Sequence, residues 1–203
     1  MFVSLLTEFP REKATLKKFL QPQKYEKLRW IHELSLKRYQ DAGHTLQEVA
    51  THERRVRQKK LSLSIAKLSL LVTLHPTAPA LGTTDHVDIA LASINAQSQF
   101  TEEIIKPVVE HCPDNPARVE LALDKLYLAR NLKKSHLRTR VVKRGLELLV
   151  EEKVVDAETL IDLFTLKKRG QGPSAETEFE IYFWALQVLR ASEVLHPYEK
   201  ELT

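Results

Sequence analysis

The apolar residues of this chain recur at spacings of three and four almost from one end to the other. This spacing is typical of amphipathic helices, because 3.6 residues complete one helical turn. Glycine occurs only 5 times in 203 residues, whereas sheets need glycine-bearing turns at short intervals. The sequence therefore predicts an all-α fold with less than about 5% strand.

The breaks in this periodicity predict how the helices are grouped. A segment with two prolines and a glycine, residues 75–84, is predicted as a loop between two helical blocks, residues 1–74 and 85–203. The arrangement favours an irregular α-solenoid of about ten mostly antiparallel helices. The helices are expected at residues 2–9, 15–20, 23–34, 38–50, 53–74, 85–98, 101–111, 118–132, 136–153, 157–166 and 175–191.

Three residues are predicted to begin or to interrupt these helices. Thr84 and Asp156 stand just before apolar-periodic segments, so each is expected to cap the helix that follows. Pro107 lies inside an expected helix and should disturb it, because proline has no backbone N–H.

The number of cysteines and the length of the apolar runs indicate in which cellular compartment the chain is expected. Cys112 is the single cysteine, which excludes an intramolecular disulfide and a multi-cysteine zinc site and fits the cytosol or nucleus. No apolar run reaches about 18 residues, so no transmembrane segment is expected. The N-terminus has no basic leader, so we expect no secretory signal. The helical pattern begins almost at Met1, from which we expect a piece of a longer chain.

The motifs that usually mark an enzyme are missing from the sequence. It contains no G-x-S-x-G, no H-E-x-x-H, no phosphate-binding glycine loop and no dinucleotide fingerprint. No two of its eight histidines are four residues apart, so no helix face presents a metal-binding pair. Cys112 follows His111 at a predicted helix C-terminus, where the helix dipole disfavours a thiolate. We therefore expect no catalytic residue, no metal and no cofactor, and a structural role for Cys112.

Two basic stretches interrupt an otherwise mixed charge pattern with a net charge of +4. Residues 130–144 contain seven basic side chains and residues 54–67 contain six, and neither stretch contains an acid. Such stretches can bind phosphates, but neither has an aromatic residue on which a base could stack. Solvated helix faces, or a surface for an acidic protein partner, are the favoured interpretations, and nucleic-acid binding is the weaker one.

The expected helix at residues 53–74 is apolar on two sides. At 100° per residue, one stripe consists of Leu61, Ile65, Leu68 and Val72. The opposite side carries Leu63, Leu70, Leu71 and Leu74, with Lys67 among them. Two explanations stay open at this point. The helix is either sandwiched between neighbours of its own chain, or one stripe with basic flanks docks the helices of another protein.

Several blocks of the chain resemble the C-terminal helical domain of the nucleoporin 133 family. They are RWIHEL at residues 29–34, KKLSLSIAKLSLL at 59–71, VVDAETLIDLFTLK at 154–167 and FEIYFWALQVLRAS at 179–192. The resemblance extends over about residues 28–192. It implies a non-catalytic scaffold subunit of the Y-shaped coat complex of the nuclear pore, located in the nuclear envelope and supporting mRNA and protein transport.

The resemblance also implies a partner. In that family the C-terminal domain binds the C-terminal domain of the neighbouring 84/107-type nucleoporin end to end, and the other Y-complex subunits are reached indirectly. The family's contact helix corresponds to residues 53–74 of this chain. The residues expected at the contact are Lys59, Lys60, Leu61, Ile65, Lys67 and Leu68.

Two alternatives from other functional classes stay open beside this one. The first is a generic α-solenoid scaffold of another coat or lid complex, and the second is a basic helical domain that binds nucleic acid.

Helical spacing near the C-terminus predicts a further part of the core. One hydrophobic core is expected to contain Phe164, Phe179, Phe183, Leu186 and Leu189.

Overall fold

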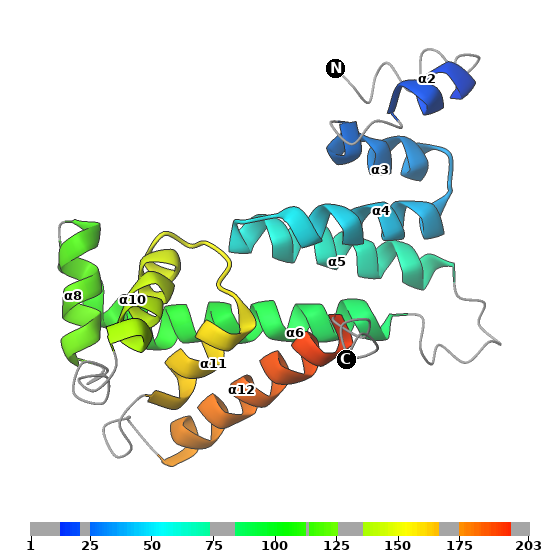
Figure 1. Cartoon of the computed structure of the whole chain (residues 1–203). Coiled ribbons are helices and arrows are strands. Elements are labelled where there is room, and N and C mark those ends of the chain that lie inside the picture. Colours follow the sequence, from blue (N-terminus) through cyan, green and yellow to red (C-terminus); the bar gives the residue numbers. More distant parts are fainter. Residues whose placement is uncertain are drawn as a thin grey trace. The chain divides into compact units, whose positions relative to one another are not determined.

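The computed structural model is almost entirely helical (Figure 1). The β-type pairing found in the described residues is an isolated bridge between Arg55 and Lys153, so the prediction of an all-α fold is confirmed. The expected helix at residues 2–9 lies outside the described part. The structure describes residues 13–20, 25–73, 84–112, 114–125, 136–166 and 175–195. The elements are α2 (Lys13–Leu20), α3 (Glu26–Ser35), α4 (Tyr39–His52), α5 (Val56–Val72), α6 (Asp85–Phe100), η3 (Thr101–Ile105), α7 (Lys106–Val109), α8 (Asn115–Lys125), α10 (His136–Val150), α11 (Ala157–Leu166) and α12 (Ala175–Leu195).

The chain divides into two compact units. The first contains residues 1–53 and 58–88, and the second contains residues 54–57 and 89–203. Within each unit, contacts join helices that follow one another in the chain, such as α3 with α4 and α11 with α12, as in an α-solenoid. The loop that separates the two predicted helical blocks falls almost wholly outside the described residues, so that boundary stays a prediction.

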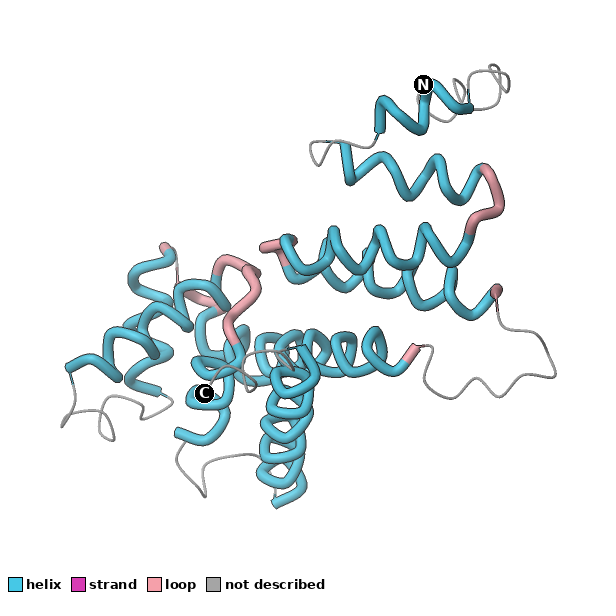
Figure 2. The backbone as a smooth tube through the Cα atoms, turned by 45° about the vertical axis from the view of Figure 1, so that its right-hand side comes forward, coloured by secondary structure: helices cyan, strands magenta, loops and turns pink. Residues whose placement is uncertain are grey.

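A short loop joins α3 to α4 (Figure 2), and it contains a residue in the left-handed conformation. Lys37 has a φ of 58°. Its N–H donates to the Leu34 carbonyl at 2.9 Å, and the N–H of Arg38 donates to the Glu33 carbonyl, also at 2.9 Å. These two bonds form the Schellman motif, in which glycine is the usual left-handed residue. A chain with few glycines uses lysine here instead.

The interface between α3 and α4 contains a buried carboxylate. The hydroxyl of Thr45 donates to Glu33 at 2.7 Å. Arg29 donates to the Thr45 hydroxyl at 3.2 Å and to Glu48 at 2.7 Å. Burial raises the pKa of Glu33, and the hydrogen bond from Thr45 and the charge of Arg29 oppose this rise. The first unit therefore holds two of its helices together partly through a polar network.

The helix expected at residues 101–111 is interrupted, as Pro107 predicts. Residues Thr101–Ile105 form a π-helical turn, and the N–H of Lys106 donates to the carbonyl of Thr101, five residues earlier. The short helix α7 continues from Lys106 with Pro107 in its first turn. Since Pro107 cannot donate a hydrogen bond, the wider turn ends where the regular ladder would lose a donor.

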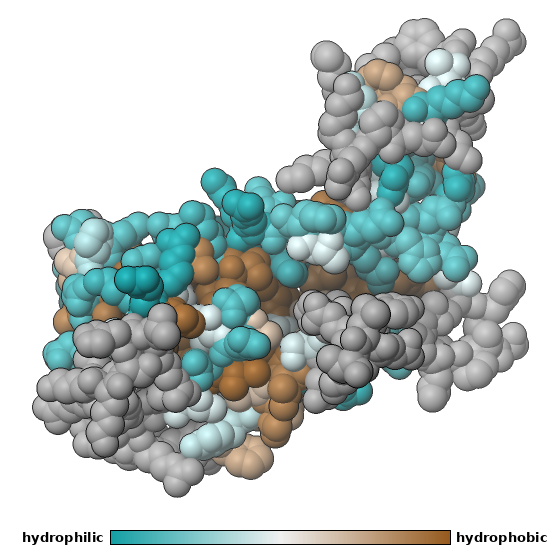
Figure 3. All heavy atoms as spheres, viewed as in Figure 1, coloured by the Kyte–Doolittle hydropathy of each residue, from teal (hydrophilic) through white to brown (hydrophobic). Residues whose placement is uncertain are grey.

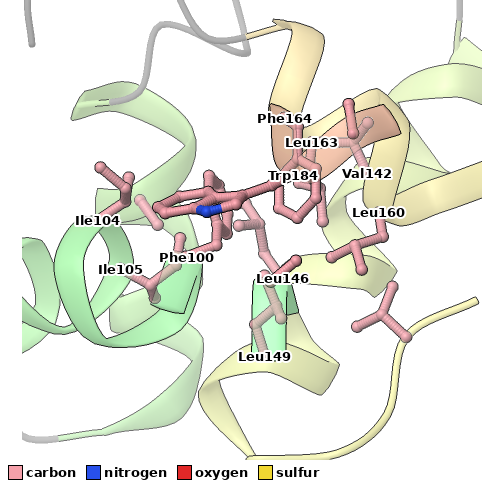
Figure 4. Packing of buried hydrophobic residues seen from close by; sticks show 14 of the residues in the cluster. Phe100, Ile104, Ile105, Val142, Leu146, Leu149, Leu160, Leu163, Phe164 and Trp184 are labelled. Atoms are coloured by element: carbon pink, nitrogen blue, oxygen red, sulfur yellow. The ribbon is translucent and has the colours of Figure 1, made fainter. Parts of the chain in front are cut away.

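The core of the second unit is built around three aromatic rings (Figure 4). The ring centroids of Phe100 and Phe164 are 4.8 Å apart in an edge-on arrangement, and those of Phe164 and Trp184 are 6.1 Å apart. Such pairs stabilise a core beyond the area that they bury. The aliphatic side chains buried in the same cluster include Ile104, Ile105, Val142, Leu146, Leu149, Leu160 and Leu163.

A buried glutamine holds the extended segment that follows α10. The side chain of Gln97 donates to the carbonyl of Lys153 at 2.7 Å and accepts from the N–H of Val155 at 3.2 Å. On the other edge of this segment, Val154 donates to the carbonyl of Arg54 at 2.7 Å. Because this segment is not helical, its backbone groups have no partners within a helix, and these hydrogen bonds satisfy them instead.

Of the two predicted side-chain caps, the one at Asp156 forms, whereas the Thr84 hydroxyl bonds a side chain of the first turn instead of a backbone N–H. Asp156 accepts a hydrogen bond from the N–H of Thr159 at 2.9 Å, so the prediction of a cap for α11 is confirmed. Thr84 immediately precedes α6, and its hydroxyl donates to the Asp88 carboxylate at 3.0 Å. The N–H of Asp88 donates to the carbonyl of Thr84 at 2.9 Å.

The expected C-terminal core is only partly correct. Phe164 is buried in the aromatic cluster as predicted. Phe179, Phe183, Leu186 and Leu189 are all exposed, because α12 turns its other face, with Trp184 and Val188, toward α11 and the core. Helical spacing groups residues on one face, but it does not decide which face of a helix meets the core.

No helix in the described part of the chain is both long enough and apolar enough to cross a membrane.

Candidate interaction helix

Helix α5 buries part of one of the two apolar stripes seen in its sequence, because Leu63 and Leu70 are buried whereas Leu71 is 40% exposed. Leu63, Ala66 and Leu70 are buried, at spacings of three and four that place them on one face. Ser69 lies beside them, and its hydroxyl donates to the carbonyl of Ile65 at 2.9 Å. This bond satisfies a buried hydroxyl without a partner from another helix.

A glycine sets the close approach of α4 to α5. A Cβ atom added at Gly43 would lie 2.8 Å from two side-chain carbons of Leu70 and 3.4 Å from the carbonyl oxygen of Ala66. The absence of a side chain at this point of α4 lets Leu70 pack directly against its backbone. The inward face of α5 is therefore fixed against α4.

The other stripe of α5 faces outward. Leu61, Leu68 and Val72 are 61%, 63% and 62% exposed. Ile65 belongs to the same stripe and is half-buried. Of the two stripes that the sequence contains, the one with Leu61, Ile65, Leu68 and Val72 is thus accessible to another molecule.

The basic residues of α5 differ in their surroundings. Lys60 is exposed. Lys59 is half-buried, and this burial lowers the pKa of its ammonium group. Lys67 forms an ion pair with Asp88 at 2.6 Å within the first unit. Lys60 is therefore the expected contact lysine that most directly offers its charge to a partner.

Acidic residues that lie outside the two basic stretches neutralise part of both. Lys143 pairs with Glu120, and Arg144 pairs with Glu147 at 2.9 Å. Arg57 lies 3.6 Å from Glu152. Three of the seven basic residues in the stretch 130–144, namely Arg130, Lys133 and Lys134, lie outside the described residues. A run of basic residues in the sequence is therefore not a run of uncompensated charge in the fold.

The chemistry of the described part does not point to catalysis. A hollow of about 410 Å³ between α8 and α10 is lined by Val119, Glu120, Lys143, Glu147 and other residues, and its lysine and glutamates are engaged in ion pairs. Within the described ranges, no three His, Cys, Asp or Glu residues come together as a metal site. Cys112 has a free, half-buried thiol. The backbone carbonyl of Cys112 accepts a hydrogen bond from the Arg118 side chain at 3.0 Å.

Sequence reasoning missed a second outward apolar face, on α12. Its exposed side chains include Phe179, Phe183 and Leu186, which were expected in the core. The signal was available, because α12, like α5, carries apolar residues on two sides: Trp184, Ala185 and Val188 lie on one, and Phe179, Phe183 and Leu186 on the other.

Comparison with known proteins assigns the chain to a family. Residues 3–202 match the family described as non-repetitive/WGA-negative nucleoporin C-terminal. The chain belongs to this nucleoporin family. Nucleoporins are components of the nuclear pore complex, which places this nucleoporin segment in the nuclear envelope at the pore.

One curated relative is similar over most of the chain. Nucleoporin nup132 of Schizosaccharomyces pombe (strain 972 / ATCC 24843) is 25% identical over 193 residues, which are 93% of this chain. The nucleoporin segment spans about 16% of the length of that relative. No solved structure matches the chain.

Proposed function

We propose that this segment is a non-catalytic scaffold module of the nuclear pore complex and that it joins its own nucleoporin to a neighbour through the outward stripe of α5. The observation that carries the proposal is the exposure of Leu61, Leu68 and Val72 on a helix whose opposite face is already packed. Membership of the nucleoporin C-terminal family supports the scaffold role. Support of mRNA and protein transport would follow from that role.

The finer assignment follows the resemblance to the nucleoporin 133 family. On this proposal the partner is the C-terminal domain of the neighbouring 84/107-type nucleoporin, and other Y-complex subunits are reached through it. Leu61, Ile65 and Leu68 are the apolar anchors, because central apolar side chains carry most of the energy of an interface. Lys59 and Lys60 lie at the rim, where charges mainly affect association rate and salt dependence.

The decisive experiment measures calorimetric affinity of the chain for that partner domain. Leu68→Glu places a charge in a contact that loses water, so we expect binding to weaken at least about 100-fold. The melting temperature should stay unchanged, since Leu68 is 63% exposed in the free chain. Gln40→Glu adds the same charge at an exposed position of α4 in the same unit and should bind as the wild type does.

Ile65→Glu tests the half-buried member of the stripe. Loss of binding with an unchanged melting temperature supports a contact at Ile65. A sharp fall in melting temperature with normal binding by the folded fraction would make Ile65 a core residue. Unchanged affinity for both Leu68→Glu and Ile65→Glu would move the contact away from α5.

The ion pair of Lys67 allows a further control. Lys67→Glu places two acids together at Asp88 and should lower stability as well as binding. The exchange Lys67→Asp with Asp88→Lys keeps an ion pair but moves the positive charge to α6. Normal binding by this double variant would remove Lys67 from the contact, whereas a loss that is larger at low salt would support it.

A further inference from the structure

The outward face of α12 is the largest apolar row that the described chain exposes on one helix. Phe179 is 76% exposed, Leu186 is 63% exposed and Phe183 is 52% exposed. Tyr182 and Leu189 complete the row. Figure 3 shows apolar side chains at the surface in the part of the view where Figure 1 places α12.

The side chains that α12 contributes to the core lie on its other side. Trp184, Ala185, Val188 and Ala191 are buried on the other side of α12. Because a large side chain presents about 150–250 Å², the exposed fractions of the five side chains in the row correspond to roughly 500 Å² of surface. Contiguous apolar patches of this size on soluble proteins commonly mark interaction sites.

The spacing of the row suits pairing with an identical row. Four of the five side chains in the row, Phe179, Tyr182, Leu186 and Leu189, follow one another at intervals of 3, 4 and 3 residues, a series that reads the same in both directions, and Phe183 lies beside this series. In an antiparallel pair of α12 helices related by a two-fold axis at the level of residue 184, Phe179 of one copy therefore lies opposite Leu189 of the other. Tyr182 then lies opposite Leu186. Such isologous contacts are the rule in homodimers.

The charges along α12 favour the antiparallel direction. Its N-terminal part contains glutamate at positions 176, 178 and 180 and no basic residue, whereas its C-terminal part contains Arg190 and Glu193 and so carries no net charge. An antiparallel pair brings the acidic end of one copy beside Arg190 of the other. A parallel pair would bring two acidic ends together, which is unfavourable.

We propose that this face of α12 binds a second copy of the same chain as an antiparallel helix pair. Two such rows bury roughly 1,000 Å², the smallest area at which specific interfaces are usually found. An interface of this size is small, so we expect a weak dimer. The inference does not depend on docking at α5, which lies on a different helix.

Sedimentation velocity of the whole 203-residue chain over a wide concentration range tests the proposal. The wild type should shift from monomer to dimer as its concentration rises. Leu186→Glu should weaken dimerisation at least about tenfold while helical content and melting temperature stay unchanged, because an exposed leucine supports no core. Gln187→Glu adds the same charge to α12 outside the row and should dimerise as the wild type does.

Mixing two variants tests the direction of the pair. Leu189→Glu and Phe179→Lys should each be monomeric alone, and an equimolar mixture should form a heterodimer in which the new carboxylate lies opposite the new ammonium group. A parallel pair would not bring these two positions together, so a mixture that stays monomeric would overturn the antiparallel arrangement.

Other results would overturn the proposal itself. A wild type that stays monomeric at the highest concentration would mean that another protein or another segment covers this face. Dimerisation of Leu186→Glu equal to that of the wild type would place a dimer contact elsewhere. Loss of helical content in both Leu186→Glu and Leu186→Ser would show that Leu186 supports the fold.

Discussion

Helices α5 and α12 have the same kind of sequence and differ in what they are packed against. Both are apolar on two sides, and both bury one side only: Leu63 and Leu70 in α5, and Trp184 and Val188 in α12. Most of α5 belongs to the first unit, where it packs against α4, whereas α12 belongs to the second, beside an aromatic core.

This comparison teaches how to interpret a helix with two apolar sides. In α4, which has one apolar side, residues such as Leu46 and Val49 are buried and need no further partner. A second apolar side exceeds what the chain's own core can cover and indicates a surface that another molecule can use. The following predictions test whether truncating inward side chains of α5 and α12 lowers the free energy of unfolding more than truncating outward ones.

The largest difference is expected within α12. Trp184→Ala removes a side chain packed against Phe164, so we expect the free energy of unfolding to fall by about 3–5 kcal/mol. Phe183→Ala, on the outward side, should cost less than about 1 kcal/mol. Urea unfolding followed by circular dichroism measures both. Equal losses would mean that both sides of α12 are packed in the free chain.

A similar but smaller difference is expected within α5. Leu70→Ala leaves a cavity beneath Gly43 and should cost about 2–5 kcal/mol, whereas Leu68→Ala should cost less than about 1 kcal/mol. The fluorescence of Trp30, in a Trp184→Phe background, follows unfolding of the first unit alone. A loss for Leu68→Ala as large as that for Leu70→Ala would place the outward stripe in a core.

Glycine-to-alanine exchange tests the close approach of helices in each unit. Alanine normally stabilises a helix by up to about 1 kcal/mol relative to glycine. We expect Gly43→Ala to destabilise by about 1–3 kcal/mol instead, because its Cβ would lie 2.8 Å from Leu70 carbons. Gly145→Ala should behave alike in the second unit, where the added Cβ would lie 2.5 Å from the Thr159 methyl group. A gain in melting temperature for either would mean that the facing helix moves away freely.

The smallest expected effect is on the pH dependence of the free energy of unfolding, and it concerns a buried carboxyl group of the first unit. Burial raises the pKa of Glu33, so the folded state holds this proton more tightly than the unfolded state does. As pH falls from 7 through the raised pKa toward the ordinary carboxyl value, the free energy of unfolding should increase relative to that of Glu33→Gln. Chemical unfolding at several pH values, followed by Trp30 fluorescence, measures this difference.

The exposed carboxylate Glu151, in the second unit, should make the free energy of unfolding decrease, not increase, as the pH falls. Its hydrogen bond with Lys153 lowers its pKa, so its contribution to the free energy of unfolding is present above the ordinary carboxyl range and is lost as pH falls through the lowered pKa.

A difference in the free energy of unfolding between wild type and Glu33→Gln that stayed constant with pH would contradict burial of an ionisable Glu33.

Much of the fold follows from the sequence alone. The fold class, the positions of most helices, the interruption near Pro107 and the cap at Asp156 depend on periodicity and on hydrogen bonds between residues at most a few positions apart. The sequence also contains both apolar stripes of α5, and with them the candidate contact residues. Local chemistry determines these features, since no distant residue is needed to form them.

Only the tertiary structure decided which faces are buried. The pairing of Lys67 with Asp88 joins residues 21 positions apart, and Gln97 binds a segment more than 50 residues away. The exposure of Phe179, Phe183 and Leu186 likewise depends on which face of α12 meets Phe164 and its neighbours. Helical periodicity states which side chains share a face, whereas burial depends on the shapes and positions of helices that are distant in the sequence.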